Sequence, residues 1–363
     1  MADNATPASG IEVRSLYKVF GANAAHAVDL VKQGISKAEL NEKHGNVLGL
    51  KDINLEMPGG CIQVIMGLSG SGKSTLIRHI NRLINPTAGE VLVGGTDVVK
   101  MNEHDLREFR RKNTAMVFQK FALLPHRTVL DNTVYGLKVR GVPRKQQVDE
   151  AMRWINRVGL DGFENRYPNQ LSGGMQQRVG LARALTNDAP ILLMDEAFSA
   201  LDPLIRTDMQ GVLLDLQKEI KKTVVFITHD LDEALRLGDR IAILRDGEVI
   251  QQGTGQEIVL HPADPYIEKF VREVNRSRVL LASSVMTPLS EPGASEGLSI
   301  AAEATLENAL HEMVRADVRT AHCLDADGRP AGALTLYAVA SAMVTPSEEP
   351  IKGKTDHCNN HML

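Results

Sequence analysis

Short apolar runs alternate with longer amphipathic stretches over most of this chain. Four runs are almost continuously apolar, namely Ile62–Met66, Thr114–Phe118, Ile191–Met194 and Thr223–Ile227. Consecutive apolar positions are typical of strands that are covered on both faces, so these runs predict strands of a buried sheet. The amphipathic stretches between them predict the covering helices. We therefore predict an α/β domain over residues 11–273.

A hairpin is predicted near the end of this domain. Ile241–Leu244 and Glu248–Gln252 flank Arg245-Asp246-Gly247. Asp-Gly between two strand-like runs is typical of a tight β-turn, because both residues tolerate positive φ. The core sheet is therefore predicted to be mixed.

Residues 22–49 interrupt the pattern with two short helices. Ala24–Lys32 has helical character, and Ser36 with Glu39 forms a capping-box signal for a second helix that Gly45 closes. We predict a helical insertion here. A surface elaboration without chemistry is one interpretation of it, and the sequence leaves that interpretation open.

The character of the chain changes after residue 273. We predict a second, small α+β unit at residues 280–345, which begins with a stretch rich in Ser, Pro, Glu and Gly. This unit holds eight acidic and three basic residues, a net charge of −5, against −4 for the whole chain. The polar segments 1–10 and 346–363 are predicted to be disordered tails.

Composition excludes several classes of protein. With 43% hydrophobic and 24% charged residues the chain is globular, while 4% aromatic residues and a negative net charge argue against a nucleic-acid partner. No run approaches the ~18 apolar residues of a membrane-spanning helix. The first ten residues lack the basic start and apolar stretch of a secretion signal. Three scattered cysteines fit a reducing cytoplasm, where we expect the protein to remain.

The C-terminal end contains a candidate metal site. His357, Cys358 and His361 have a spacing that can hold a metal ion. Their place at the end of a polar tail favours a frayed terminus instead, so we predict no metal there.

The first motif that indicates chemistry follows the strand at Ile62–Met66. Residues 67–75, GLSGSGKST, match the pattern G-x-x-x-x-G-K-[ST], and a helix is predicted at Leu76–Leu83. Glycines let such a loop direct its N–H groups at phosphate oxygens, and the helix adds the positive end of its dipole. Lys73 is predicted to contact the outer phosphates and Ser74 to bind Mg²⁺. A purely structural turn would not need this Lys and Ser.

A second motif follows Ile191–Met194. The strand places Asp195 at its carboxyl end, where ligands bind in open α/β sheets, and Glu196 comes next. We predict that Asp195 binds Mg²⁺ and that Glu196 polarises the attacking water. Two carboxylates at a strand end are often only solvated, but beside a phosphate-binding loop the functional interpretation is preferred. The two motifs together predict a P-loop NTPase.

A third motif distinguishes families of P-loop NTPases. Leu171–Gln177, LSGGMQQ, precedes a predicted helix at Arg178–Leu185. A Ser-Gly-Gly turn at a helix N-terminus is a second anion-binding site. With all three motifs in order, the chain resembles an ABC ATPase and this segment resembles the family's signature motif.

The resemblance implies roles for further residues. Phe20 resembles the aromatic residue that stacks on adenine, and Gln119 resembles the glutamine that senses Mg²⁺ and signals to a membrane partner. Ser199 and Asp202 belong to the sequence SALD, which matches the loop at the dimer interface. His229 matches the switch histidine that contacts the γ-phosphate, although a histidine at a strand end is otherwise often structural.

By this resemblance, two copies of the chain form a homodimer in the ATP-bound state, and the cofactors are ATP and Mg²⁺. Each ATP lies between Lys73 and Asp195 of one copy and Ser172 and Gly174 of the other, so that losing the γ-phosphate opens the dimer. The residues implied are Phe20, Gly67, Ser69, Gly70, Ser71, Gly72, Lys73, Ser74, Thr75 and Gln119 for ATP; Ser74, Gln119 and Asp195 for Mg²⁺; Ser172, Gly173, Gly174 and Gln176 for the partner's ATP; Ser199 and Asp202 for the interface; and Glu196 and His229 for catalysis.

Three features narrow the resemblance to the glycine betaine/proline-betaine importers. They are the insertion, the sequence DEAFSALDPLIR at Asp195–Arg206, with Ala197 where most ABC motors have Pro, and the C-terminal unit. That unit, through Val285–Pro288 and Asp325–Arg329, resembles one cystathionine-β-synthase (CBS) type regulatory repeat, where relatives often carry two.

The resemblance implies an ATP-hydrolysing subunit that energises import of a quaternary amine. Its implied partners are a membrane-spanning permease and, indirectly, a solute-binding protein, at the cytoplasmic face of the inner membrane. Two alternatives stay open. The same motor could serve another solute such as histidine or proline, because solute choice resides in other chains, or the protein could be a non-transport ABC ATPase that acts as a switch.

Overall fold

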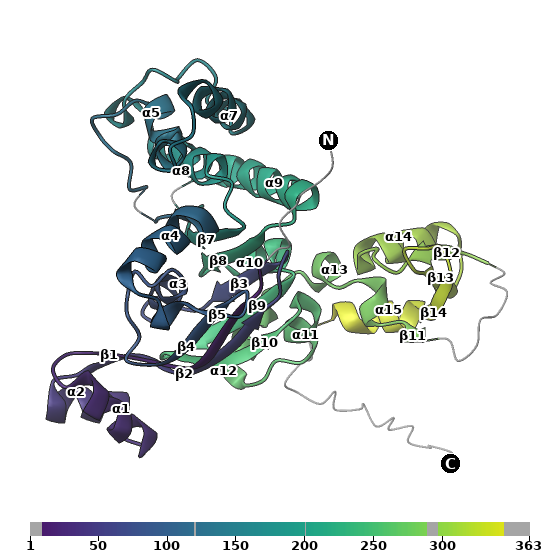
Figure 1. The fold of residues 1–363 in the computed structure, drawn as a ribbon. Helices are drawn as coiled ribbons and strands as arrows, with labels where there is room; N and C mark the ends of the chain where they lie inside the picture. The colour runs from purple at the N-terminus through teal and green to yellow at the C-terminus, as the bar shows by residue number, and fades with distance from the viewer. Residues whose placement is uncertain (1–8, 120, 200, 289–296, 345–363) are drawn as a thin grey trace, which may run out of the picture. The chain divides into compact units, whose positions relative to one another are not determined.

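The computed structural model describes residues 9–119, 121–199, 201–288 and 297–344 (Figure 1). The chain forms two compact units, Met1–Val271 and Arg272–Leu363. The predicted tail at 346–363 and the candidate metal site at its end lie outside the described residues, as do residues 1–8. Ser9 and Gly10 join the first unit, since their carbonyls accept hydrogen bonds from Thr223 Oγ1 and the amide of Gly94.

A six-stranded sheet forms the centre of the first unit, in the order β10-β9-β3-β8-β7-β6. Its strands are β3 (Ile62–Met66), β6 (Thr114–Val117), β7 (Ile191–Asp195), β8 (Thr223–Thr228), β9 (Arg240–Arg245) and β10 (Glu248–Gly253). All neighbours are parallel except β9 and β10, which form an antiparallel pair. The four predicted strands and the predicted hairpin are confirmed. Every residue of β3, β7 and β8 is buried, which explains their unbroken apolar sequences.

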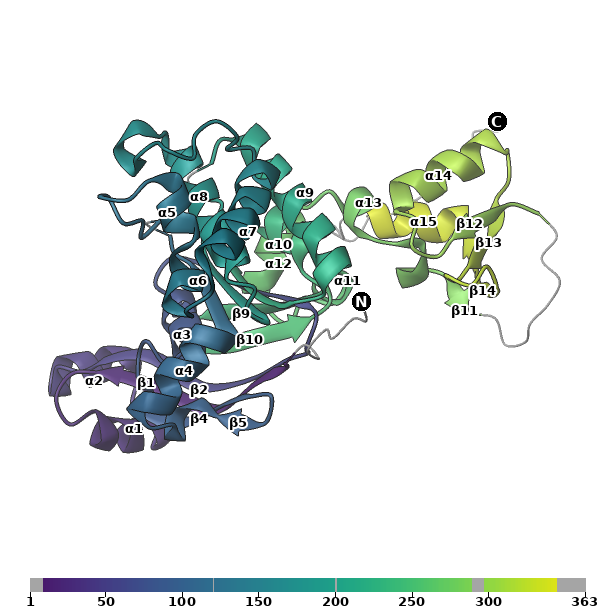
Figure 2. The ribbon, with the colours of Figure 1, turned by 45° about the horizontal axis from the view of Figure 1, so that its top comes forward.

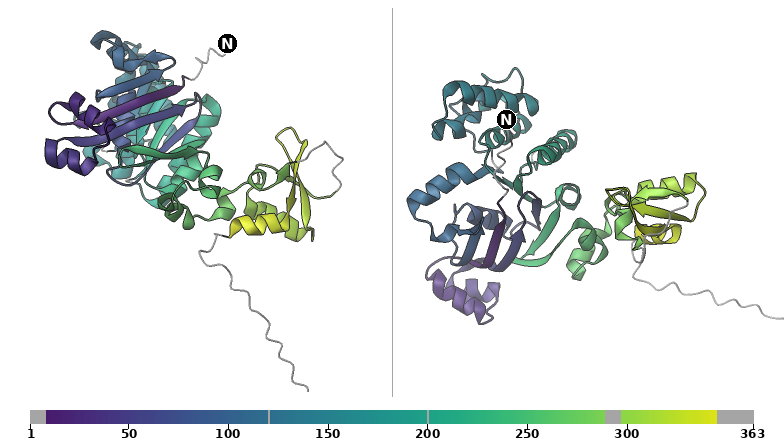
Figure 3. Two further views of the ribbon diagram at one scale, coloured as in Figure 1. Left: turned by 90° about the horizontal axis from the view of Figure 1, so that it is seen from below. Right: turned by 45° about the vertical axis from the view of Figure 1, so that its right-hand side comes forward.

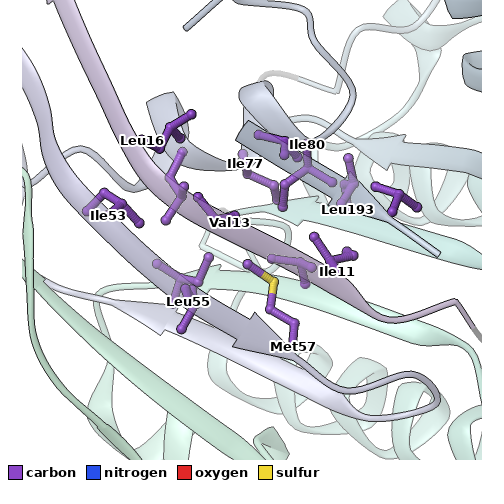
Figure 4. Packing of buried hydrophobic residues seen from close by; sticks show 14 of the residues in the cluster. Ile11, Val13, Leu16, Ile53, Leu55, Met57, Ile77, Ile80 and Leu193 are labelled. Carbon is purple, nitrogen blue, oxygen red and sulfur yellow. The ribbon is translucent and has the colours of Figure 1, made fainter. Parts of the chain in front are cut away.

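A second sheet of four antiparallel strands, in the order β2-β1-β4-β5, is not predicted by the sequence patterns. Its strands are β1 (Ile11–Phe20), β2 (Val47–Met57), β4 (Ala88–Val93) and β5 (Thr96–Asp97). Register shifts interrupt the pairing of β1 with both neighbours, so apolar residues do not alternate regularly along it. Figure 4 shows buried side chains of β1 and β2 packed with Ile77 and Ile80 of α3 (Lys73–Ile80) and Leu193 of β7, which makes one core for the two sheets.

The insertion between β1 and β2 forms the two predicted helices, α1 (Ala24–Lys32) and α2 (Lys37–His44). Both halves of the capping box between Ser36 and Glu39 are present, and Gly45 ends α2 with φ of 63°. The helices pack on the end of the four-stranded sheet through a small cluster around the fully buried Leu40 (Figure 1). Since β2 begins at Val47, the last three residues assigned to the insertion are strand instead, because Leu48 and Leu50 alternate into the core.

Helices cover the sheets and form a separate helical region of the first unit (Figure 2). The helical region contains α5 (Val129–Thr133), α6 (Tyr135–Val139), α7 (Arg144–Arg157) and α8 (Gly173–Thr186), which pack on one another. The remaining helices of this unit are α4 (Glu103–Asn113), α9 (Pro203–Ile220), α10 (Leu231–Leu237), α11 (Gly255–Leu260) and α12 (Pro265–Arg272). Both α3 and α8 begin earlier than predicted, because Lys73–Thr75 of the first motif and Gly173–Gln177 of the third motif already belong to the helices.

The second unit contains a small sheet in the order β11-β14-β13-β12 (Figure 3). Its elements are α13 (Arg276–Val279), β11 (Thr287–Pro288), β12 (Ser299–Ala301), α14 (Leu306–Arg315), β13 (Thr320–Leu324), β14 (Pro330–Thr335) and α15 (Leu336–Met343). Strands β12 and β13 are parallel, the other pairs are antiparallel, and α14 contacts α15. In neither unit does a helix of the described residues have the length and apolar character needed to cross a membrane.

Candidate functional site

A cleft of about 310 Å³ lies where the loop between β3 and α3 passes beneath the start of β2. Most of the loop from Ser69 to Thr75 lines it, together with Val47–Gly49 and with Lys37, Gln119 and Glu196. The fold therefore brings the predicted phosphate-binding loop together with two predicted residues that are distant from it in sequence.

Glycine is required at two positions of this loop by close backbone approach. A Cβ atom on Gly67, whose φ is 152°, would lie 2.2 Å from the carbonyl oxygen of Leu244. A Cβ atom on Gly72, whose φ is 102°, would lie 2.8 Å from the carbonyl oxygen of Gly49. The loop thus packs closely between β9 and β2, which fixes its curvature at the N-terminus of α3.

The loop contains two buried polar groups, the ammonium of Lys73 and the hydroxyl of Ser71. Lys73 Nζ donates hydrogen bonds to the carbonyl oxygens of Gly67 at 2.7 Å and Leu68 at 3.0 Å. Burial lowers the pKa of the Lys73 ammonium, and nearby carboxylates oppose that change. Among the described residues, the buried Ser71 Oγ has no hydrogen-bond partner. A folded-back lysine and an unsatisfied hydroxyl fit an anionic ligand such as a phosphate group.

Asp195, the last residue of β7, is fully buried and accepts two hydrogen bonds. Ser74 Oγ donates to its Oδ1 at 2.7 Å, and an Arg78 guanidinium nitrogen donates to its Oδ2 at 3.1 Å. A serine hydroxyl beside a carboxylate suits Mg²⁺, which takes oxygen ligands and keeps several waters. Sequence reasoning missed Arg78, although its position four residues after Ser74 places both on one face of α3.

Glu196 connects the ends of three neighbouring strands. Its Oε2 accepts a hydrogen bond of 2.6 Å from Gln119 Nε2, which follows β6, and its Oε1 lies 3.8 Å from Nδ1 of His229, which follows β8. Glu196 has φ of 47°, an uncommon conformation for a residue with a side chain. The three predicted residues are therefore brought together at the carboxyl edge of the sheet.

Phe20 lies beside the cleft rather than in its lining. Its half-exposed ring covers Gly49, where an added Cβ atom would be 2.8 Å from ring carbon Cε2. The ammonium of Lys18 lies 4.9 Å from the ring centroid. Because Gly49 itself lines the cleft, the ring stands at the cleft's edge.

The signature residues do not line the cleft of their own chain. Ser172 caps α8, where its Oγ accepts a hydrogen bond from the amide of Met175 at 3.3 Å. Gln176 Nε2 donates to the carbonyl oxygens of two residues before the helix. Asp202 caps α9 in the same way, and Ser199 Oγ donates to the carbonyl oxygen of Glu196 at 3.0 Å.

Comparison with known proteins gives concordant results. A family model described as ABC transporter matches residues 50–199. The chain is 55% identical to the glycine betaine transport ATP-binding protein OpuAA of Bacillus subtilis, over 76% of this chain and 66% of that protein. It is 53% identical to the glycine betaine/proline betaine transport system ATP-binding protein ProV of Escherichia coli, over 76% and 69%. The chain thus spans about two thirds of the length of these relatives.

Solved structures agree with these matches. The dimeric structure of a bacterial ABC transporter cassette has a TM-score of 0.58 and 34% sequence identity, and covers 68% of this chain and 98% of that one. A second structure of that cassette is of a post-hydrolysis state bound to ADP and Pi, with a TM-score of 0.59 and 33% identity over the same shares. In both comparisons the similar structure is an ABC cassette, and the match covers about two thirds of this chain.

Replacing Arg78 by Met tests how the buried charge of Asp195 is held. In the nucleotide-free protein we expect the free energy of unfolding to fall by about 1–3 kcal/mol, the usual cost of an under-satisfied buried group. In an Asp195→Asn background the same change should cost less, because the amide carries no charge. Urea denaturation of the four proteins measures both costs. Equal costs in the two backgrounds would show that Arg78 does not compensate the carboxylate.

Proposed function

The chain belongs to the ABC transporter family, among the ATP-binding proteins of glycine betaine transport systems, and we propose that it hydrolyses ATP to energise import of a quaternary amine. Identity of 53–55% to three proteins named for glycine betaine transport carries this proposal. Identity to proteins named for trimethylamine N-oxide transport is 45–46%, and it falls to 40% for one named for sulfate/thiosulfate. Among these relatives, identity is thus highest for the proteins named for glycine betaine transport.

The cleft residues divide the work of nucleotide binding. Lys73 and Ser71 would hold phosphate oxygens of ATP, the lysine by exchanging its two carbonyl partners for a negatively charged one. Ser74 and Asp195 would hold Mg²⁺, with Arg78 keeping the carboxylate in place. Phe20 at the cleft's edge is the proposed stacking surface for adenine.

Glu196 is the proposed general base. Gln119 donates to Glu196 Oε2, so Oε1 on the side of His229 keeps lone pairs that can accept a proton from the attacking water. His229 would contact the terminal phosphate from the adjacent strand end. ATP supplies the phosphoanhydride bond whose hydrolysis releases these contacts.

We further propose that ATP closes a homodimer. Ser172 and Gly173 are exposed at the N-terminus of α8, outside the cleft, and that end of a helix is suited to a partner's phosphates. The similar cassette of known structure is described as dimeric. The dimer would lie at the cytoplasmic face of the inner membrane, on a separate permease that a solute-binding protein serves.

For residues 280–345 we propose a single CBS-like regulatory unit. Its order of strand, helix, two strands and helix, from β12 to α15, supports this assignment. Its net charge of −5 gives a reason to expect a response to ionic strength, because interactions between exposed charges weaken as the salt concentration rises. A dimer-stabilising appendage is the competing role.

Reconstitution tests the proposed function. The protein is reconstituted in proteoliposomes with the permease and the solute-binding protein. Glycine betaine on the side of the membrane that holds the solute-binding protein should raise ATPase activity, whereas histidine and proline should not. Stimulation by one of the two amino acids alone would assign the motor to another solute. Failure to co-purify with any membrane-spanning protein would favour a non-transport ATPase switch.

The Glu196→Gln variant separates binding from hydrolysis. The amide cannot accept the proton, so turnover should fall at least ~100-fold while ATP binding persists, which should trap a dimer. Light scattering with ATP measures its mass. Adding Ser172→Arg should give a monomer, because the bulky cation would occupy the partner's side of the interface. Near-normal turnover of Glu196→Gln would exclude Glu196 as the base, and a monomer with ATP bound would contradict the dimer.

Deletion of the residues after Glu273 tests the CBS-like unit. We expect the truncated protein, in the reconstituted complex, to keep ATPase activity and transport but to change their dependence on salt. Activity of the two complexes across a salt series is the measurement. Superimposable curves would leave only a structural role for the unit.

A further inference from the structure

The helical insertion contributes a lysine to the cleft. Lys37 is the first residue of α2, and it lines the cleft together with the glycine-rich loop and the start of β2. The helix that carries it is anchored, because the buried Leu40 one turn later packs against the strands. The base of the insertion is closed where Asn46 Nδ2 donates to the carbonyl oxygen of Ala22 at 2.7 Å. The position of Lys37 is therefore set by packing.

The ammonium group of Lys37 is only weakly held by its ion-pair partner. Its recorded ion-pair partner is Asp246 at 3.8 Å, and the two side chains are 43% and 76% exposed. An ion pair that is this long and this exposed contributes little, so a better anion can displace the carboxylate at small cost. Asp246 lies in the turn between β9 and β10, next to Gly247, whose amide donates to the carbonyl oxygen of Ser71 in the loop. The pair thus stands at the cleft that the loop lines.

The location of Lys37 indicates which part of a nucleotide it would meet. Helix α2 packs on β2, and the insertion that carries it leaves β1 at Phe20 and joins β2 at Val47, which also lines the cleft and pairs with Phe20. Lys37 therefore belongs to the side of the cleft where the aromatic ring lies, whereas Lys73 is buried against the far end of the loop at Gly67. A cation near the nucleoside end faces the phosphate group attached to the ribose.

We propose that Lys37 is a nucleotide-binding residue that contacts the phosphate nearest the ribose, in competition with Asp246. This inference rests on the proposed function, since it takes the cleft to bind ATP. The phosphate concerned is common to ATP and ADP, so Lys37 would increase affinity for both without distinguishing them. The insertion would then be part of the nucleotide site rather than a surface elaboration.

Calorimetric titration of the full chain with ATP, ADP and adenosine at low ionic strength tests the proposal. Lys37→Ala should weaken ATP and ADP equally, by about 1.5- to five-fold, the range expected of one exposed charge pair, and leave adenosine unchanged. Lys37→Arg should restore binding because it keeps the charge. Asp246→Asn should tighten both nucleotides, and Asn also tolerates the positive φ of 52° at this turn. Half-molar salt should reduce all these differences.

Lys43→Ala is the matched control. Lys43 lies on the same helix and pairs with Glu39 at 3.1 Å, but it does not line the cleft, so its removal should not change binding. Unchanged affinities for Lys37→Ala would overturn the proposal, as would a loss confined to ATP or a matching loss for adenosine. Lys73→Ala distinguishes failure of the Lys37 proposal from failure of the proposed function. If Lys73→Ala weakens ATP binding and Lys37→Ala does not, only the role of Lys37 fails. If neither weakens ATP, the cleft is not the nucleotide site.

Discussion

The carboxyl ends of β3, β6, β7 and β8 meet along one edge of the six-stranded sheet because these strands are parallel. Each end supplies one part of the candidate site: the loop after β3, Gln119, the Asp195-Glu196 pair and His229. The hydrogen bond from Ser74 to Asp195 then ties the loop to the end of β7. The remaining structure supports this edge, since α3 is held in place by side chains from both sheets.

Local sequence signals were sufficient for much of this arrangement. The buried strands have unbroken apolar runs, the hairpin has Asp-Gly, and α2 has a complete capping box, so each could be predicted without knowledge of distant residues. The three motifs likewise carry their chemistry in contiguous residues. This is why the loop, the carboxylate pair and the signature segment were identified from the sequence and the resemblance that it carries.

Features that depend on distant contacts could not be predicted. The antiparallel sheet pairs β1 with β2 and β4 across register shifts, and positive φ at Ser15 and Asp52 disturbs the alternation of apolar residues. Arg78 reads as an ordinary helix residue until β7 places Asp195 beside it. Lys37 reads as a solvated helix residue until the insertion folds back toward the loop. In each case the partner is separated by a long stretch of chain.

The insertion joins two strands whose ends are already paired, since Phe20 lies opposite Val47. A segment attached at such a point can lengthen, shorten or be exchanged without shifting the register of the strands, because the entropy of closing a loop rises only slowly with its length. The rim of the cleft can therefore change without altering the carboxyl edge of the six-stranded sheet. For the same reason, this junction is a natural place to graft a reporter domain whose signal would follow occupancy of the cleft.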